Sequence, residues 1–192
     1  MADLATAPVT ADDNRLHAVT MISANDGWAV GESNVFTSTG AVTSGLIEHW
    51  NGTAWTKATS PSGEPTGARL LAVSAVSTSD VWAVGAEHWD GTAWTLVPSP
   101  TITTNNAQDS LTGGVALSST DVWAVGQTLA NFSTITTLAL HWNGTNWQIV
   151  SSANRSTTVN VFNAVTGSAP GEPLWAVGQG GNANTLIETT TG

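Results

Sequence analysis

The chain has 192 residues and carries few charges, four Lys and Arg against 14 Asp and Glu, for a net charge of -10. A protein that binds nucleic acid or an anionic membrane surface needs a basic patch, so the composition excludes both classes. Hydrophobic residues make up 41% of the chain, which predicts a folded core. No apolar run approaches the roughly 20 residues that span a bilayer. The absence of cysteine excludes a disulfide framework and a thiolate site.

Three sequence blocks recur along the chain and predict a repeat fold. The tetrapeptide Trp-Ala-Val-Gly begins at Trp28, Trp82, Trp123 and Trp175, at spacings of 54, 41 and 52 residues. A block of the form His-Trp-Asn/Asp-Gly-Thr-x-Trp follows the first three copies, at residues 49–55, 88–94 and 141–147. A short apolar segment precedes each tetrapeptide, at residues 16–19, 71–73, 111–115 and 162–165.

Each repeat predicts four β-strands, because the blocks are rich in β-branched and aromatic residues and lack helical periodicity. The short apolar segment is the first strand and the tetrapeptide is the second. The third strand ends at the His-Trp pair, and the fourth runs from the next tryptophan to a proline, as from Trp55 to Pro61. Asn51-Gly52 predicts a two-residue type I′ turn between them. That turn would place Trp50 and Trp55 diagonally on one sheet face.

The second strand is apolar on both faces, which indicates a sheet that is covered on both sides. Four-stranded units at this period are typical of β-propellers. The Asp-Val-Trp-Ala-Val-Gly and His-Trp-Asn-Gly-Thr-x-Trp motifs resemble repeats of bacterial β-propeller proteins of the Asp-box and kelch-like kind. The resemblance implies an all-β fold, a four-bladed propeller, as one domain over residues 1–192. The blades are expected at residues 16–61, 70–100, 111–152 and 161–189.

The last repeat offers three strands, and the N-terminus offers a candidate for the fourth. Leu4–Pro8 precedes Leu16 much as the segment ending at Pro61 precedes Leu70. We therefore expect residues 3–9 to complete the last blade and close the ring, which removes two free sheet edges. The alternative is half of a larger ring that a second chain completes, so the protein is a monomer or a homodimer. Residues 1–8 lack the basic and apolar regions of a signal peptide.

Strand alternation places the loops between second and third strands, and those between blades, on one face of the ring. Long irregular loops are expected there at Glu32–Gly45, Gln127–Thr137 and Gln179–Asn184, with nearly none at Ala86. Irregular loops carry function more often than short repetitive turns do. We expect a ligand on this face, at the mouth of the central channel.

Three of the four cations point to the same channel mouth. Arg15 and Arg69 precede a first strand, and Arg155 lies in the equivalent connection of the fourth blade. Clustered guanidinium groups there would bind carboxylate or sulfate groups of a ligand. The alternative is that the arginines form ordinary surface ion pairs with nearby acids, namely Asp12, Asp13 and Glu64.

One position of the first strand changes its character from repeat to repeat, being His17, Leu71, Thr112 and Asn163. Its side chains are expected to face the channel, which makes His17, Thr112 and Asn163 candidate ligand-binding residues. His17 is also the candidate catalytic residue, as a general base that titrates near neutral pH. The alternative is a hydrogen-bonded histidine that lines the channel.

The repeated histidines His49, His88 and His141 are predicted to form hydrogen bonds inside their own blades, because third strands of separate blades cannot converge on one metal ion. No metal and no cofactor are expected. The repeated tryptophans are expected to pack between blades.

The pattern as a whole favours a non-catalytic binding or protein-interaction module that holds a carbohydrate or a partner protein at the channel mouth. The threonine-rich, lysine-poor composition favours a bacterial, extracytoplasmic protein. The alternative is a small propeller enzyme of the lyase, cyclase or hydrolase type, with its active site at the channel mouth. HExxH, GxSxG and P-loop patterns do not occur in the sequence.

Overall fold

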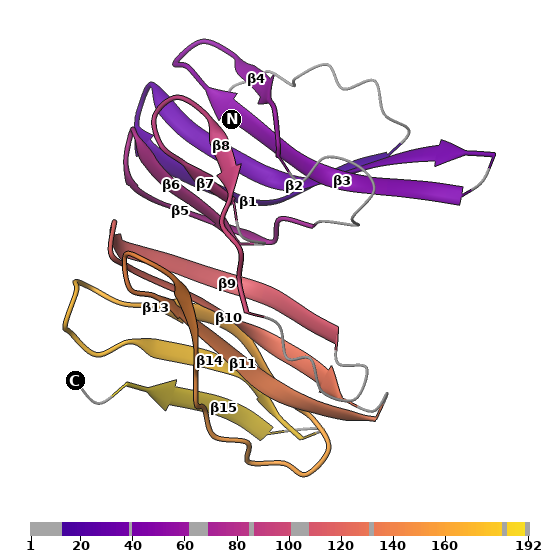
Figure 1. Cartoon of the computed structure of the whole chain (residues 1–192), viewed down its shortest axis with the longest axis vertical. Helices are drawn as coiled ribbons and strands as arrows, with labels where there is room; N and C mark the ends of the chain where they lie inside the picture. The colour runs from indigo at the N-terminus through magenta and orange to yellow at the C-terminus, as the bar shows by residue number, and fades with distance from the viewer. Residues whose placement is uncertain are drawn as a thin grey trace. The chain divides into compact units, whose positions relative to one another are not determined.

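The computed structural model describes residues 13–38, 40–61, 69–84, 87–100, 108–130, 133–181 and 184–190, and their regular structure is entirely β-strand. The chain divides into two compact units, Met1–Val97 and Pro98–Gly192. Each unit contains two antiparallel sheets, which we call blades (Figure 1).

The first unit contains two four-stranded sheets, in each of which the strands lie side by side in chain order. Blade 1 consists of β1 (Asp13–Ser23), β2 (Asp26–Thr37), β3 (Gly40–Trp50) and β4 (Trp55–Ala58). Blade 2 consists of β5 (Ala72–Ser77), β6 (Asp80–Val84), β7 (Glu87–Trp89) and β8 (Trp94–Leu96).

The second unit repeats this order. Blade 3 consists of β9 (Gln108–Ser118), β10 (Asp121–Ala130), β11 (Thr134–Trp142) and β12 (Trp147–Val150). Blade 4 has three strands among the described residues, β13 (Asn160–Thr166), β14 (Trp175–Gly180) and β15 (Asn184–Thr189). The four predicted sheets are therefore present. The predicted strand at residues 3–9 lies outside the described residues, so closure of a ring and a single domain stay predictions.

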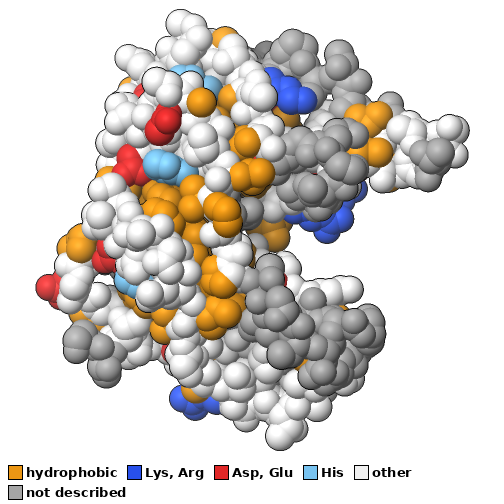
Figure 2. All heavy atoms as spheres, in the orientation of Figure 1, with side chains coloured by type: hydrophobic (Ala, Val, Ile, Leu, Met, Phe, Trp, Pro, Cys, Tyr) orange, Lys and Arg blue, Asp and Glu red, His pale blue; other side chains and the backbone are white. Residues whose placement is uncertain are grey.

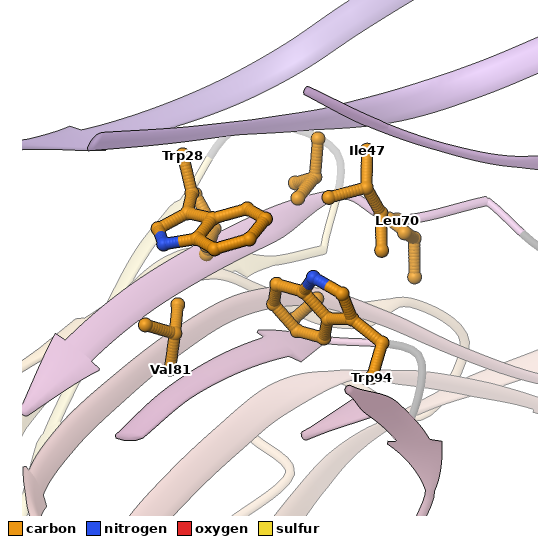
Figure 3. Close-up of a cluster of buried hydrophobic side chains, with 8 residues drawn as sticks. Trp28, Ile47, Leu70, Val81 and Trp94 are labelled. Carbon is orange, nitrogen blue, oxygen red and sulfur yellow. The ribbon is translucent and has the colours of Figure 1, made fainter. Parts of the chain in front are cut away.

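Apolar packing between consecutive sheets builds the core of each unit. Side chains alternate along the second strand, so Trp28 and Val30 point to one side of blade 1, which we call the forward face. Blade 2 covers that face with its own rear face, the side that carries Val81 and Ala83. Figure 3 shows Trp28 opposite Trp94 between the two sheets. In the second unit, the forward face of blade 3 meets the rear face of blade 4 through Val125, Ala139, Phe162 and Leu186.

The repeated histidine forms a hydrogen bond inside its own sheet, which confirms the prediction. The imidazole Nε2 lies 2.8–2.9 Å from an aspartate Oδ1 at the start of the second strand, in the pairs His49–Asp26, His88–Asp80 and His141–Asp121. Each histidine ring also lies 4.3 Å from the tryptophan ring of the adjacent second strand. In blades 2 and 3 the same aspartate oxygen accepts the tryptophan Nε1–H at 2.9 Å. This contact ties the second strand to the third.

The turn between third and fourth strands differs from the prediction. Trp50 pairs directly with Trp55, with their ring centroids 5.7 Å apart, so the diagonal placement is wrong. Asn51 Oδ1 accepts hydrogen bonds from Thr53 N, Thr53 Oγ1 and Ala54 N at 2.8–3.0 Å. The asparagine side chain thus captures local donors and builds a four-residue connection in place of a two-residue turn.

Two predicted irregular loops are extended hairpins instead. In blade 1, β2 and β3 pair without interruption from Gly27 opposite Trp50 to Thr37 opposite Gly40, as Figure 1 shows. In blade 3, β10 and β11 pair out to Ala130 opposite Thr134. The threonine- and valine-rich segments continue the ladder because β-branched residues fit a pleated sheet. The connection at Gln179–Asn184 is short, and Ala86 lies outside the described residues.

The Asp90 carboxylate in the turn between β7 and β8 should make the stability of the protein depend on pH in acid. Hydrogen bonds from the Thr92 hydroxyl, and then from the Ala93 and Thr92 backbone N–H groups, lower the pKa of Asp90 from 3.8 to about 2. The charged carboxylate therefore contributes stability above pH 3.8, and this contribution is lost as the pH falls through about 2. NMR titration of the carboxyl carbon should show this pKa, and Thr92→Ala should raise it toward 3.8. Asp90→Asn, which copies Asn51 and Asn143, should lose less stability over the same pH window.

Deletion of residues 1–9 tests closure of the ring. If these residues supply the fourth strand of blade 4, their loss exposes the edge of β15, and we expect a large fall in the thermal midpoint. A truncated chain that remains monomeric and melts at the same temperature as the full chain would contradict closure. Light scattering that gives twice the mass of one chain would favour the dimeric ring.

Candidate functional site

Four polar side chains of the first unit meet where blade 2 packs against blade 1. They are Arg15 and His17 of β1, Glu32 of β2, and Arg69, which lies before β5. We call them the Glu32 cluster. The Glu32 carboxylate is buried, with 3% of its side chain exposed, whereas the Arg15 and Arg69 side chains are 62% and 63% exposed.

The Glu32 carboxylate holds the cluster together. Arg69 Nε lies 2.7 Å from Glu32 Oε2, and this ion pair joins the segment before blade 2 to blade 1. Arg15 Nη1 lies 3.9 Å from Glu32 Oε1, and Arg15 Nη2 contacts Asp13 Oδ2 at 3.0 Å. His17 Nε2 lies 4.0 Å from Glu32 Oε1, beyond hydrogen-bond distance.

A β-bulge at His17 produces this arrangement. The register of β1 against β2 shifts between Leu16 and Ala18, so His17 is the extra residue and Arg15 faces Glu32 across the ladder. At Gly31 an added Cβ would collide with the Arg15 carbonyl oxygen, which explains the glycine of the repeated tetrapeptide. Leu70 N then donates to Gly31 O at 3.3 Å and brings Arg69 beside Glu32.

The same bulge recurs in blades 3 and 4, where the extra residues are Thr112 and Asn163. In blades 1, 3 and 4, the position that varies between repeats is therefore a bulge residue. Such a residue is left unpaired in the ladder, so different side chains are tolerated there. The Thr112 hydroxyl donates to the Phe162 carbonyl oxygen at 2.7 Å and so joins blades 3 and 4. Asn163 is exposed on β13.

Arg155 belongs to the second unit, where it is exposed in the connection between β12 and β13. It borders a shallow hollow of about 570 Å³ that Gly181 and Asn184 also line. A common channel mouth for Arg155 and the two arginines of the first unit stays a prediction. Lys and Arg side chains are few on the face that Figure 2 shows.

Glu32 is the member of the cluster that the sequence did not reveal as a site residue, because it was expected to begin an irregular loop. An alignment of the repeats could have singled it out, because Gln127 and Gln179 occupy the equivalent position after the tetrapeptide and only blade 1 carries an acid there among the three. Arg15 does pair with Asp13, as the alternative interpretation predicted. The other two expected partners, Asp12 and Glu64, lie outside the described residues.

Two absences apply to the described part of the chain. It contains no group of three or more His, Asp and Glu side chains that could hold a metal ion. It contains no helix long and apolar enough to cross a membrane.

Four antiparallel sheets that follow one another along the chain fit a β-propeller fold. The fold is similar to the solved structure of the β-propeller YCF48 bound to D1 peptide, with a TM-score of 0.53 at 18% sequence identity. The match covers 91% of this chain and 55% of that one, so the chain spans about half the length of its structural neighbour. No protein-family model and no curated protein sequence matches the chain.

The two arginines should differ in their effect on stability. Arg69→Ala leaves the buried Glu32 carboxylate without its short contact and should lower the free energy of unfolding by about 1–3 kcal/mol, less than a fully buried pair costs because Arg69 is largely exposed. Arg15→Ala should cost less than about 1 kcal/mol. In urea unfolding, Glu32→Gln should remove most of the Arg69→Ala penalty. Additive losses in that double-mutant cycle would show that the two groups are not coupled.

Proposed function

We propose that the protein is a non-catalytic interaction module that binds an acidic segment of a partner polypeptide at the Glu32 cluster. The observation that carries this proposal is one buried carboxylate beneath two largely exposed guanidinium groups. Contacts that fix a guanidinium before a ligand arrives reduce the side-chain entropy that binding must remove. The remaining N–H donors of each arginine suit the planar, bidentate recognition of a carboxylate.

The charge balance of the chain supports an acidic ligand at this place in particular. Arg15 and Arg69 are two of only four Lys and Arg residues in a chain of net charge -10. Most of such a surface repels an acidic segment. A local pair of arginines therefore determines where the segment binds and which of its residues lies at the arginines. Blades 3 and 4 carry Ser110 and Val161 at the positions equivalent to these arginines.

The hairpin of β2 and β3 adds an apolar contact beside the cluster. Phe36 follows Glu32 on the same strand and the same face of the sheet, and it is 60% exposed. An extended peptide that places an acidic residue against the arginines could lay an apolar residue against this hairpin. A propeller fold with a bound peptide, as in YCF48, supports this kind of ligand. The composition supports an extracytoplasmic location for the module.

The test is a selection followed by an affinity measurement. The full chain is screened against a displayed library of extended peptides and, in parallel, against a glycan array that includes sulfated and carboxylated sugars. We expect acidic peptides to be selected. Their affinity is then compared between Glu32→Gln, which keeps both arginines, and the triple variant Glu32→Gln, Arg15→Gln, Arg69→Gln.

The triple variant should bind at least tenfold more weakly than Glu32→Gln, because hydrogen bonds to charged groups contribute about 1.5–3 kcal/mol each. Lys57→Gln with Arg155→Gln is the matched control, since it removes the same charge elsewhere and should change affinity little. An equal loss in the control would assign the effect to net charge alone. Selection of glycans and no peptides would replace the proposed partner with a carbohydrate.

A further inference from the structure

A cavity of about 320 Å³ lies between blades 3 and 4 of the second unit. Its wall is mainly apolar and includes Trp123, Val125, Phe162 and Leu174. It is about twice the size of an engineered apolar cavity of roughly 150 Å³ that binds benzene. A large aromatic side chain would therefore fit.

The first unit shows what occupies the same place between blades 1 and 2. There Trp94, from the fourth strand of blade 2, lies against Trp28 with their ring centroids 5.1 Å apart (Figure 3). Trp89 lies 5.0 Å from the same Trp28 ring. In the second unit, Trp123 takes the place of Trp28 and Thr190 takes the place of Trp89. The described residues of blade 4 supply no counterpart of Trp94.

In the described part of the chain, the sheet next to the cavity also has an open edge. The third strands β3, β7 and β11 each pair with a fourth strand, whereas β15 pairs only with β14 among the described residues. Glu188 of β15 lines the cavity, and its Oε1 is buried without a hydrogen-bond partner among the described residues. An incoming N–H group would find an acceptor there.

We propose that blade 4 binds an extended segment of a partner polypeptide as its fourth strand, antiparallel to β15, with a tryptophan of that segment inserted in the cavity between blades 3 and 4. The chain's own fourth strands define the required pattern. Each begins with tryptophan and has Ala58, Val97 or Val150 three residues later. Pairing of a partner strand with β15 is independent of the Glu32 cluster, because the cluster lies in the other unit.

The chain's own predicted strand at residues 3–9 does not meet that pattern. Pro61 and Pro100 each follow the first tryptophan of their fourth strand by six residues, and six residues before Pro8 stands Ala2. An alanine at the tryptophan position would leave most of the cavity unfilled. A partner segment with tryptophan at that place buries more apolar surface and fits better.

The experiment uses a fluorescein-labelled peptide that copies residues 143–152, the fourth-strand segment of blade 3, and measures its anisotropy with the full chain. We expect saturable binding. Replacing the peptide's tryptophan by alanine should weaken binding at least tenfold, because the cavity is then unfilled. A peptide N-methylated at alternate backbone nitrogens should also bind at least tenfold more weakly, since it cannot pair with β15.

Two variants of neighbouring residues on β14 test the site from the protein side. Ala176→Phe fills the cavity and should weaken binding at least tenfold. Val177→Phe, on the opposite face of the same strand and 42% exposed, is the matched control and should leave affinity unchanged. Thermal melts of both variants check their folding, and the peptide pair decides the question if Ala176→Phe does not fold.

Equal affinity of the tryptophan and alanine peptides would overturn the proposal. So would binding that appears only after residues 1–9 are deleted, since the chain's own segment would then occupy the edge. The triple variant of the Glu32 cluster should bind this peptide as the unchanged chain does. A loss in that variant would place the peptide at the cluster and would also overturn the proposal.

Discussion

Each unit depends on one apolar contact, the packing of the forward face of its first blade against the rear face of its second blade. Trp28 and Val30 on one side of β2 and Ala29 on the other side are all buried, so this segment of the sheet needs cover on both faces. Such a sheet is stable only when neighbours cover it. The repeated Trp-Ala-Val-Gly tetrapeptide places apolar side chains on both faces of the second strand and so creates this need for cover. His49, which contacts Asp26, lies with its ring 4.3 Å from the ring of Trp28 and so supports that side chain within the sheet.

The same scaffold produces the candidate site through a local irregularity. A bulge in the first strand recurs in blades 1, 3 and 4, and the glycine that ends the tetrapeptide makes room for it. In blade 1 the bulge sets Arg15 opposite Glu32, and the packing of blade 2 adds Arg69. Structural residues therefore recur in the repeats, whereas the ionic contact depends on residues that change from blade to blade.

Much of the fold could be predicted from the sequence because its signals are repeated. Strand order, the apolar contact between blades and the histidine hydrogen bonds follow from blocks that occur three or four times. The predictions that were wrong concern a turn in which a side chain accepts backbone hydrogen bonds, and polar strands whose composition resembles that of a loop. Asn51 accepts hydrogen bonds from backbone N–H groups and changes the turn, and residues 32–37 and 40–45 continue a ladder although they are rich in serine and threonine. Glu32 was not predicted as a site residue because an irregular loop was expected to begin there, and because its partners Arg15 and Arg69 lie far from each other in sequence.

Departures from the repeat are the most informative residues of this chain. Trp28 is 2% exposed and Trp175, at the same position of blade 4, is 50% exposed, and Val177 and Ile187 beside it are also exposed. On blade 1, Leu16 and Val19 are 50% and 62% exposed, whereas their counterparts Leu70 and Val73 in blade 2 are buried. Each of these apolar residues occupies a position that is buried in at least one other blade. Among the described residues, these two faces therefore keep apolar side chains at positions that an adjacent sheet covers in another blade.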